Sequence, residues 1–342
     1  MIRGSLGYNS CPNILIILEQ TTMRATARAQ PNIALIKYWG KRDTRRNLPA
    51  VGSISITLAD LFTETSVELD DDLLHDCLVV NDRDDPGMMP RISKCLDEVL
   101  GSDRPRARVD SRCNFPIAAG LASSASAFAA VVVAGAAAAG QPHNADEMAR
   151  LAGRASGSAA RSLFGGYVEL TSDDDDISVA SICSVEEWPL SVVVAITESG
   201  AKTIGSSEAM EISRNTSPFY DRWVGAQAED LKTARDAISA RDFEQLAAVA
   251  EHNCLKMHSV MWASRPPVVY WNSATLNCLQ AIRELQSRGV AVFFTIDAGP
   301  QVKAICLPEE EVVVRSALAG TSGVSNILVS GLGAGAELVK QR

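Results

Sequence analysis

A long run of small apolar residues is the feature that most constrains how this chain can fold. From about residue 125 to Gly140 the sequence is rich in alanine and valine, and a loop of small residues precedes it. The composition predicts a helix that is apolar all round, and such a helix must be enclosed by other elements on every side. With 342 residues and 46% hydrophobic composition, the chain can build that enclosure as one large core or two moderate ones, and its length favours two domains.

Charge and cysteine spacing exclude several classes of protein. The formal net charge of -9 argues against binding to nucleic acid or to an anionic membrane, because both need a dominant basic surface. The apolar patch at residues 14–18 is too short to span a bilayer. The eight cysteines lie far apart and form no C-x-x-C pair, so we expect free thiols in a reducing, cytoplasmic setting. Residues 1–24 read as a poorly specified extension, and organellar targeting is the alternative for them.

The order of predicted elements favours an α+β protein of two lobes. Strand patterns and helix patterns interleave without a regular strand–helix–strand repeat. We expect lobes at residues 25–187 and 188–342, with the boundary near residues 186–189. The predicted strands are 53–69, 107–110, 166–170, 177–180, 190–196 and a strand ending at 297, and the later predicted helices are 145–154, 219–240, 243–262 and 271–288.

The densest cluster of cations lies between Lys37 and Arg46. This stretch holds Lys37, Lys41, Arg42, Arg45 and Arg46, interleaved with two aromatic residues, in a chain that is acidic overall. Such a cluster suits a small polyanion. A solvated basic loop is the alternative, because aromatic neighbours often only pack against the stems of basic side chains.

Two further segments place small residues and hydroxyls where helices could begin. Residues 120–124 precede the apolar helix, and free amide groups at a helix N-terminus bind phosphate, while their serines can cap the helix. A tightly packed helix start is the alternative, since the segment matches no general nucleotide motif. In residues 154–162, Arg161 could clamp a carboxylate or phosphate through two parallel hydrogen bonds, or it could be an exposed arginine on a capped helix.

Asp297 ends an apolar strand directly before a tight turn, so it reads either as a reactive carboxylate or as a turn cap. His252 and His258 are six residues apart and would not share a helix face, so we expect core or surface histidines. The glycines at 331–335 leave too little chain after them for a dinucleotide-binding unit.

Taken together, these segments resemble the mevalonate diphosphate decarboxylase family, which belongs to the galactokinase, homoserine kinase, mevalonate kinase and phosphomevalonate kinase (GHMP) superfamily. The similarity runs from about Ala27 to about Ser330. Its most specific part is the Lys-Tyr-Trp-Gly-Lys core at residues 37–41. Residues 31–43, 114–125, 156–166 and 294–300 carry the four matching motifs.

The resemblance implies a fold, a reaction and partners. The expected fold is a two-lobed, GHMP-kinase-like α+β fold with the active cleft between the lobes. The expected reaction is ATP-dependent phosphorylation of the 3-hydroxyl of (R)-5-diphosphomevalonate, followed by loss of carbon dioxide and phosphate. The product is isopentenyl diphosphate, an intermediate of isoprenoid and sterol synthesis. ATP is the co-substrate, Mg²⁺ is expected with ATP, no protein metal ligand is assigned, and a homodimer is expected.

The resemblance also implies roles for individual residues. Four positions are expected at the reacting centre, with Asp297 orienting the 3-hydroxyl and accepting its proton and Arg161 holding the substrate carboxylate: Asn32, Lys37, Arg161 and Asp297. Substrate contacts are expected at Tyr38, Trp39, Gly40, Lys41, Arg91, Ser156, Gly157, Ser158, Ala159, Ala160, Arg161, Ser206 and Ser207. ATP contacts are expected at Gly120, Leu121, Ala122, Ser123 and Ser124.

The sequence departs from the family pattern at several positions. Ala160 stands where the family often has cysteine, residues 51–53 stand where it often has Asn-Ser-Ser, and Ser207 varies within the family. Lys303 is unusual because its surroundings are normally small and apolar. Three alternative functions stay open from sequence: a superfamily kinase or decarboxylase acting on mevalonate, phosphomevalonate or a 3-phosphorylated relative, a catalytically silent binding or scaffolding protein, and a nicotinamide oxidoreductase.

Overall fold

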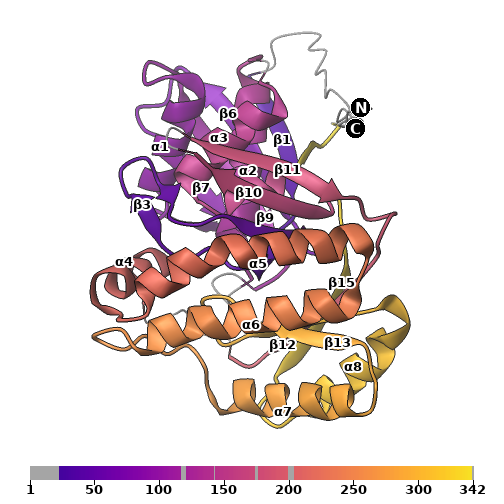
Figure 1. Cartoon of the computed structure of the whole chain (residues 1–342). Helices are drawn as coiled ribbons and strands as arrows, with labels where there is room; N and C mark the ends of the chain where they lie inside the picture. Colours follow the sequence, from indigo (N-terminus) through magenta and orange to yellow (C-terminus); the bar gives the residue numbers. More distant parts are fainter. Residues whose placement is uncertain (1–22, 117–120, 142, 174–175, 199–203, 341–342) are drawn as a thin grey trace, which may run out of the picture.

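The chain folds into two lobes of mixed helices and sheets (Figure 1), and the expectation of a two-lobed α+β protein is confirmed. The computed structural model describes residues 23–116, 121–141, 143–173, 176–198 and 204–340. Most of the predicted extension at residues 1–24 therefore lies outside the described residues. Within the described part of the chain, no helix is both long enough and apolar enough to cross a membrane.

The first lobe is built on two sheets with helices between and beside them. The larger sheet has six strands, antiparallel except for the parallel pair β7–β9: β16 (Glu337–Leu338), β1 (Arg24–Ala29), β6 (Thr63–Asp70), β9 (Arg106–Cys113), β7 (Cys77–Val80) and β8 (Arg83–Asp84). The smaller, antiparallel sheet contains β11 (Ile177–Cys183), β10 (Tyr167–Ser172), β5 (Ser53–Thr57) and β2 (Asn32–Ile36). The remaining elements are β3 (Lys41–Asp43), β4 (Leu48–Pro49), α1 (Met89–Leu100), α2 (Ser123–Ala138), α3 (Ala145–Ala155) and η1 (Ala159–Leu163).

The apolar helix α2 is enclosed as its composition predicts. It packs on β1 and β6 of the larger sheet, and α1, α3 and η1 cover its other sides. The helix starts after Ala122, which adopts a left-handed conformation (φ 53°), and makes no side-chain capping hydrogen bond. The prediction that serines cap this helix is wrong, because Ser123 and Ser124 already form its first turn. The amide groups of that turn are thus not used by a side-chain cap.

The second lobe has one antiparallel sheet with helices on both faces. Its strands, in spatial order, are β13 (Val292–Thr295), β14 (Val302–Cys306), β12 (Ser191–Ile196) and β15 (Asn326–Gly331). The helical elements are α4 (Ser206–Thr216), α5 (Tyr220–Ala240), α6 (Phe243–Trp262), α7 (Ser273–Ser287), η2 (Pro308–Glu310) and α8 (Glu311–Ala319). Helices α7 and α8 pack against this sheet. Helix α6 contacts β13 of the same sheet and also β2 of the first lobe. The α5–α6 pair is therefore the layer that joins the two lobes (Figure 1).

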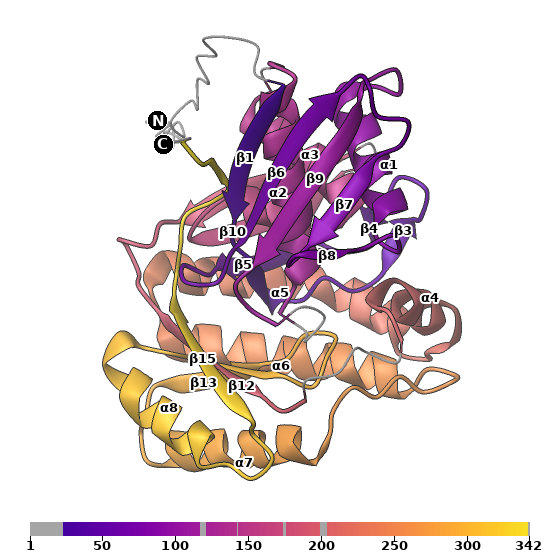
Figure 2. The same ribbon diagram turned by 180° about the vertical axis from the view of Figure 1, so that it is seen from behind.

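The end of the chain returns to the first lobe, as the view from behind shows (Figure 2). After β15 the glycine-rich segment runs beside the first lobe, and β16 then pairs with β1. The amide of Gly333 donates to Thr57 O at 2.8 Å. A Cβ on Gly333 would lie 2.5 Å from Leu58 O, so glycine here permits close approach of two backbones. These glycines serve chain packing and give no support to the oxidoreductase alternative.

A buried ion pair anchors α1, the helix that carries Arg91. Both terminal nitrogens of Arg104 donate to Asp76, at 2.9 and 2.7 Å, and the two side chains are almost fully buried. Ser93 of α1 and the backbone amide of Ala107 donate to the same carboxylate. Burial alone would raise the pKa of Asp76, but the hydrogen bonds from Arg104, Ser93 and Ala107 lower it to about 2.

Asp76→Asn is expected to reduce the free energy of unfolding by about 3 kcal/mol at pH 7, because the buried Arg104 loses its buried carboxylate partner and keeps only Asp97, which is partly exposed. The folded-state pKa of Asp76 lies below the unfolded value, so this stabilisation is present above about pH 4 and is lost as the pH falls through about 2. Urea unfolding at pH 7 and pH 3 measures the effect. The difference in urea midpoint between Asp76→Asn and wild type should shrink at pH 3. Asp82→Asn, which changes an exposed carboxylate, is the control. Equal urea midpoints for Asp76→Asn and wild type at pH 7 would contradict the prediction.

Candidate active site

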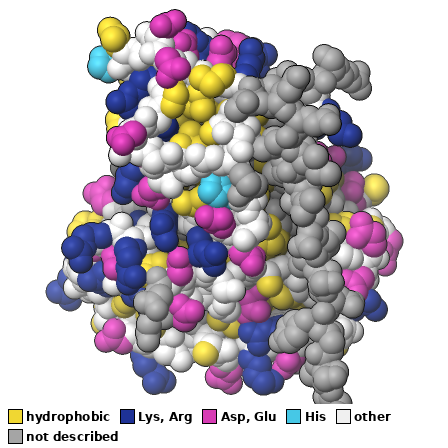
Figure 3. All heavy atoms as spheres, turned by 90° about the horizontal axis from the view of Figure 1, so that it is seen from above, with side chains coloured by type: hydrophobic (Ala, Val, Ile, Leu, Met, Phe, Trp, Pro, Cys, Tyr) yellow, Lys and Arg dark blue, Asp and Glu magenta, His cyan; other side chains and the backbone are white. Residues whose placement is uncertain are grey.

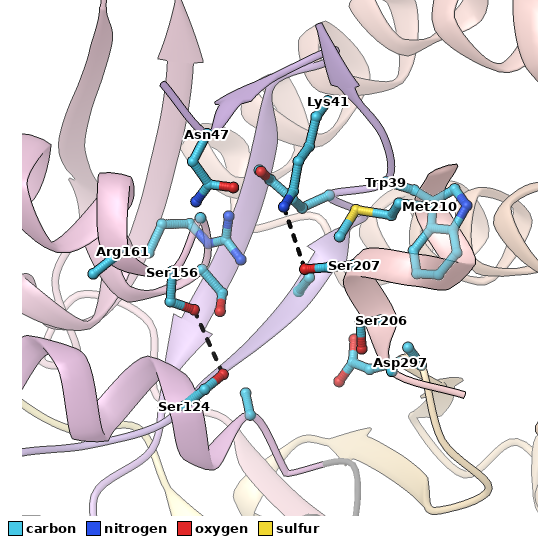
Figure 4. Close-up of a pocket in the computed structure, with 18 of the residues that line it drawn as sticks. Trp39, Lys41, Asn47, Ser124, Ser156, Arg161, Ser206, Ser207, Met210 and Asp297 are labelled. Atoms are coloured by element: carbon cyan, nitrogen blue, oxygen red, sulfur yellow. Dashed lines mark hydrogen bonds between the residues drawn. The ribbon is translucent and has the colours of Figure 1, made fainter. Parts of the chain in front are cut away.

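A cavity of about 600 Å³ lies between the two lobes (Figure 4). The first lobe contributes the turn after β2, the first turns of α1 and α2, and the segment from α3 to η1. The second lobe contributes the start of α4, one residue of α6, and the turn after β13. The cavity therefore brings together the segments that the sequence singled out, and it lies in the cleft where the resemblance placed the active site.

The lining of this cavity is strongly basic. Among the described residues, seven lysine or arginine side chains line it against a single carboxylate, that of Asp297: Lys37, Lys41, Arg45, Arg91, Lys94, Arg154 and Arg161. This concentration occurs in a chain whose net charge is -9. The upper face of the molecule, by contrast, carries side chains of both signs of charge (Figure 3). A cavity lined in this way favours a ligand with several negative charges.

Lys37 and Asp297 form an ion pair at the inner end of the cavity. The Nζ atom of Lys37 lies 2.6 Å from Oδ1 of Asp297 and also donates to Ala34 O at 2.9 Å. Only 1% of Lys37 is exposed. The basic segment is therefore split: Lys37 is buried, whereas Arg42, Arg45 and Arg46 are exposed, so the solvated-loop alternative describes only its second half.

Two buried amide side chains from the second lobe hold the backbone of Lys37. Its N–H donates to Asn253 Oδ1 of α6 at 2.8 Å, and its carbonyl accepts from Gln227 Nε2 of α5 at 2.8 Å. Asn253 in turn donates to Gln227 and to Asp230. This network fixes the segment after β2 against the α5–α6 layer and thereby sets the position of Lys37.

Asp297 has a cation beside each of its oxygens. Lys303 of β14 lies 3.2 Å from Oδ2, opposite the contact between Lys37 and Oδ1. Burial would raise the pKa of Asp297, but the ammonium groups of Lys303 and Lys37 outweigh burial and hold that pKa well below its usual range. The carboxylate is ionised at neutral pH. Its side chain bonds lysines instead of the turn that follows, so the turn-cap alternative does not describe it.

Arg161 is fixed by three oxygen acceptors and is almost fully buried. Its Nε donates to Asn32 Oδ1 at 3.2 Å and to Ser55 Oγ at 3.0 Å, and its Nη1 donates to Ser53 Oγ at 2.5 Å. Asn32 is itself held by bonds from its Nδ2 to Ser158 O and Ser162 Oγ. Burial lowers the pKa of Arg161 to about 10, so the guanidinium stays charged at neutral pH. The exposed-arginine alternative is therefore excluded, and this fixed cation lines the cavity.

Hydroxyl and basic groups lie along the remainder of the cavity. Lys41 Nζ donates to Ser207 Oγ at 3.2 Å across the cleft, and Ser156 Oγ lies 3.5 Å from Ser124 Oγ (Figure 4). Arg91 packs over the ring of Phe128 and donates to Ala155 O at 3.3 Å. The ligand-facing groups are thus held by neighbouring protein groups from both lobes.

Tyr38 packs directly on the glycine of the 156–161 segment. A Cβ on Gly157 would lie 2.3 Å from Tyr38 Oη and 2.5 Å from its Cζ atom. Burial raises the pKa of Tyr38, so the phenol stays protonated at neutral pH. Glycine at this position lets the tyrosine ring form one side of the cavity.

Gly157→Ala is expected to lower kcat/KM about tenfold, because a ring displaced by an ångström disturbs the placement of a bound ligand. The free energy of unfolding should fall by only about 1 kcal/mol, as is usual for modest overpacking. Steady-state kinetics and urea unfolding measure the two effects. Gly225→Ala is the control, since nothing lies within 4 Å of a Cβ at that position; equal kcat/KM values for the two variants would contradict the prediction.

Most of the sequence-predicted site residues line the cavity, and a few do not. Ala159 and Ala160 are fully buried in the core of the first lobe, because η1 turns their methyl groups toward α2. Leu121 is also a core residue, and Gly40, Ser123 and Leu121 are absent from the cavity lining of the described chain. Gly120 lies outside the described residues. The predicted site residues that do line the cavity are Asn32, Lys37, Tyr38, Trp39, Lys41, Arg91, Ala122, Ser124, Ser156, Gly157, Ser158, Arg161, Ser206, Ser207 and Asp297.

The structure adds lining residues that the motifs did not assign. They include Thr44, Arg45, Asn47, Lys94, Arg154, Met210 and Met257. For Lys94 a signal existed in the sequence: it lies three residues after Arg91 and therefore on the same helix face. The two methionines come from helices of the second lobe, and no local pattern distinguishes them from core residues.

The histidines behave as core and surface residues, as predicted. His258 is fully buried and contacts Ile296 O through Nε2 at 3.1 Å, while His252 is exposed. Burial lowers the pKa of His258 to about 3, so the imidazole is neutral at physiological pH. Across the described ranges, no group of three or more histidine, cysteine or acidic residues could hold a metal ion.

Comparison with known proteins identifies the family of this chain. Residues 29–183 match the family described as Diphosphomevalonate decarboxylase-like N-terminal domain, and residues 192–325 match the Mevalonate 5-diphosphate decarboxylase C-terminal domain. The diphosphomevalonate decarboxylase of Eremothecium gossypii is 33% identical, over 88% of this chain and 82% of that protein. The enzyme of Saccharomyces cerevisiae is also 33% identical, over 85% and 80%.

Solved structures give the same result. The mevalonate diphosphate decarboxylase of Staphylococcus aureus superposes with a TM-score of 0.87 at 34% identity, covering 93% of this chain and 98% of that one. A structure solved with MVAPP, AMPPCP and magnesium superposes with a TM-score of 0.86 at 32% identity, covering 93% and 99%. The two family matches and the full-length similarity agree, and this chain belongs to the diphosphomevalonate decarboxylase family.

Proposed function

We propose that this protein is a diphosphomevalonate decarboxylase that converts (R)-5-diphosphomevalonate and ATP to isopentenyl diphosphate, ADP, phosphate and carbon dioxide. The observation that carries the proposal is the ion-paired Asp297 at the inner end of a cavity lined by seven cations. A substrate with a diphosphate at one end and a hydroxyl and carboxylate at the other matches that distribution of charge. The relatives named for this reaction, and the relative solved with MVAPP and AMPPCP, support it.

Asp297 orients the 3-hydroxyl of the substrate for attack on the γ-phosphorus of ATP. Its pKa is held well below the usual range, which makes it a weak base but a reliable hydrogen-bond acceptor. Phosphoryl transfer passes through a loose transition state, so alignment of the hydroxyl contributes more than early removal of its proton. Asp297 takes up the proton as the bond from oxygen to phosphorus forms, and Lys37 holds the carboxylate in place.

Arg161 holds the substrate carboxylate for the second step. Phosphorylation turns the 3-oxygen into a leaving group, and positive charge develops at the tertiary carbon as phosphate departs. The bond to the carboxylate then breaks, its electrons form the alkene, and carbon dioxide is released. Because Nε and Nη1 of Arg161 are bound to protein oxygens, the guanidinium is held in one orientation. Asn32 completes this support.

The other lining groups bind phosphates. Lys41, Arg91 and Ser207 surround the diphosphate of the substrate. The Ser124 hydroxyl and the backbone amides at the start of α2 donate hydrogen bonds to the phosphates of ATP. The remaining proposed contacts with diphosphomevalonate are Tyr38, Trp39, Ser156, Gly157, Ser158 and Ser206.

Mg²⁺ fits this cavity as a companion of ATP. The hydroxyl of Ser124 is available to it, and Mg²⁺ that accompanies ATP usually keeps several waters and is bound by the phosphates. Bound beside Ser124, the ion would neutralise charge on the transferring phosphates. The relative solved with magnesium and AMPPCP supports this proposal.

We also propose that the lobes divide near residues 187/188, that the protein is a homodimer, and that it works in the cytoplasm. The two family matches, at residues 29–183 and 192–325, support the boundary. Seven described cysteines are free thiols, which supports a reducing compartment. Sedimentation velocity tests the dimer, which a single monomeric boundary at micromolar concentration would contradict.

The proposed activity is tested by incubating the protein with ATP, Mg²⁺ and, in turn, mevalonate, phosphomevalonate and diphosphomevalonate. Isopentenyl diphosphate and carbon dioxide are expected from diphosphomevalonate alone. A phosphorylated product without carbon dioxide would instead make this a kinase, and no ATP turnover with any of the three would indicate a binding protein.

A further inference from the structure

Lys303 is a lysine with no exposed surface, placed in the middle of a sheet. It lies on β14, paired with Thr295 of β13 on one side and Val194 of β12 on the other. Its neighbours Val302 and Ala304 belong to the apolar cluster under α7 and α8. Because side chains alternate along a strand, Lys303 projects to the opposite face, where its Nζ lies 3.2 Å from Asp297 Oδ2.

Burying a lysine costs free energy unless a partner compensates the charge. Two other titratable groups of the described residues interact with this cluster from α6, and neither supplies a negative charge: Cys254 is a buried thiol whose pKa burial raises, and His258 is neutral. Burial also lowers the pKa of Lys303. Asp297 is therefore the carboxylate that compensates Lys303, and it serves Lys37 at the same time.

Two cations on different oxygens restrict a carboxylate more than one cation does. The terminal torsion of an aspartate is broad and roughly twofold, so a single partner leaves the carboxylate plane free to rock. With Lys37 on Oδ1 and Lys303 on Oδ2, both ends of that plane are fixed. Each carboxylate oxygen can accept more than one hydrogen bond, so a substrate hydroxyl can still bind. In the described part of the chain, the cavity is lined by Asp297 but not by Lys303, and so Lys303 acts through Asp297.

We propose that Lys303 is a positioning residue for phosphoryl transfer, which holds the Asp297 carboxylate plane from the side opposite Lys37. The inference rests on the proposed function, since it assigns Lys303 a part in that reaction. In this chain Asp297 then works chiefly by aligning the 3-hydroxyl, with its orientation set by two lysines.

Lys303→Met removes the charge and the donor while keeping an unbranched side chain of similar length in an apolar surrounding. It is expected to lower kcat at least tenfold while KM for ATP and for diphosphomevalonate changes less than threefold. Lys303→Gln keeps a donor for Oδ2 and should lose less of kcat than the methionine variant. Lys232→Met, which removes an exposed lysine of α5 that pairs with Asp236, is the control.

The coupling of Lys303 to Asp297 is tested by the double variant. In the Asp297→Asn background, Lys303→Met should cause no further loss of kcat beyond twofold, because the carboxylate that Lys303 positions is already absent. A tenfold loss in both backgrounds would reduce Lys303 to a packing residue and overturn the proposal. So would a kcat for Lys303→Met within twofold of wild type.

Unfolding in urea supplies a readout that does not depend on activity. Asp297→Asn leaves two buried ammonium groups facing one amide, so it should lower the urea midpoint more when Lys303 is present than when residue 303 is methionine. Equal midpoint shifts in the two backgrounds would overturn the link between Lys303 and Asp297. If the wild-type protein released no carbon dioxide, the proposed function would fail, while this comparison would still decide whether the two residues are coupled.

Discussion

Asp297→Asn is expected to lower kcat about 10³-fold, within the range for loss of a positioned proton acceptor. The amide still fills the space but cannot take up the proton of the 3-hydroxyl, and it presents one acceptor oxygen where the carboxylate presents two. Steady-state release of carbon dioxide measures the loss. Calorimetric titration with diphosphomevalonate should give a Kd within threefold of wild type, because phosphate contacts are untouched.

The same variant should remain folded but be less stable by about 3 kcal/mol, since Lys37 and Lys303 lose their shared counter-charge. Asp236→Asn, which removes an exposed carboxylate of α5, is the matched control and should keep full activity. Turnover near the wild-type value with a folded Asp297→Asn protein would remove Asp297 from the mechanism.

Arg161→Lys is expected to lower the rate of carbon dioxide release about 10²-fold, as loss of one preorganised charge-stabilising group typically does. The guanidinium spans Asn32, Ser55 and Ser53 and still faces the cavity, whereas an ammonium is a point charge that cannot reproduce this set of contacts. Because Arg161 acts mainly in the second step, ADP formation in a single turnover should exceed carbon dioxide release. Rapid acid quench with both products measured tests this.

Arg150→Lys is the control, because Arg150 is a partly exposed arginine of α3 outside the cavity lining of the described chain. It should match wild type in both products. Unchanged carbon dioxide release by Arg161→Lys would count against the carboxylate-holding role.

The sequence predicts the main elements well because their signals are local. The enclosed helix α2, the helices α3, α5, α6 and α7, and the strands β9, β10 and β12 all lie close to their expected positions. The sequence patterns do not predict helices α1, α4 and α8. Helix α1 starts at a proline-containing turn, α4 begins with two serines after a glycine, and α8 follows a proline and two glutamates. In each case the residues at the helix start also suit a turn, so the sequence pattern alone does not distinguish a helix start from a turn.

The sequence predicts the motif residues of the site but not the side chains that hold them in place. The motif residues 31–43, 156–166 and 294–300 meet in one cavity, as the resemblance implied. The contacts that hold them come from outside these motifs. Asn253 and Gln227, which bind the backbone of Lys37, lie at positions that no sequence pattern singles out. Ser53, which accepts a hydrogen bond from Arg161, lies in a segment noted only for its departure from the family pattern. These pairs are more than 100 residues apart in the chain, so only the packing of α5, α6 and β5 brings them together.

The role of Lys303 also depends on contacts that the local sequence does not predict. In the sequence it stands out only as a lysine where the family resemblance implies small and apolar surroundings, and lysines are rarely buried without a partner. Its burial and its contact with Asp297 follow from the register of β14 between β13 and β12, and that register is a property of the folded sheet.

The central claim is that diphosphomevalonate is phosphorylated in one cavity and then loses both phosphate and carbon dioxide there. It is tested most directly by supplying [1-¹⁴C]diphosphomevalonate with Mg²⁺ and [γ-³²P]ATP and following labelled carbon dioxide and labelled phosphate in the same reaction. Equal amounts of the two are expected throughout the time course, with both lost in Asp297→Asn. Labelled phosphate without labelled carbon dioxide, or carbon dioxide release that persists in Asp297→Asn, would contradict it.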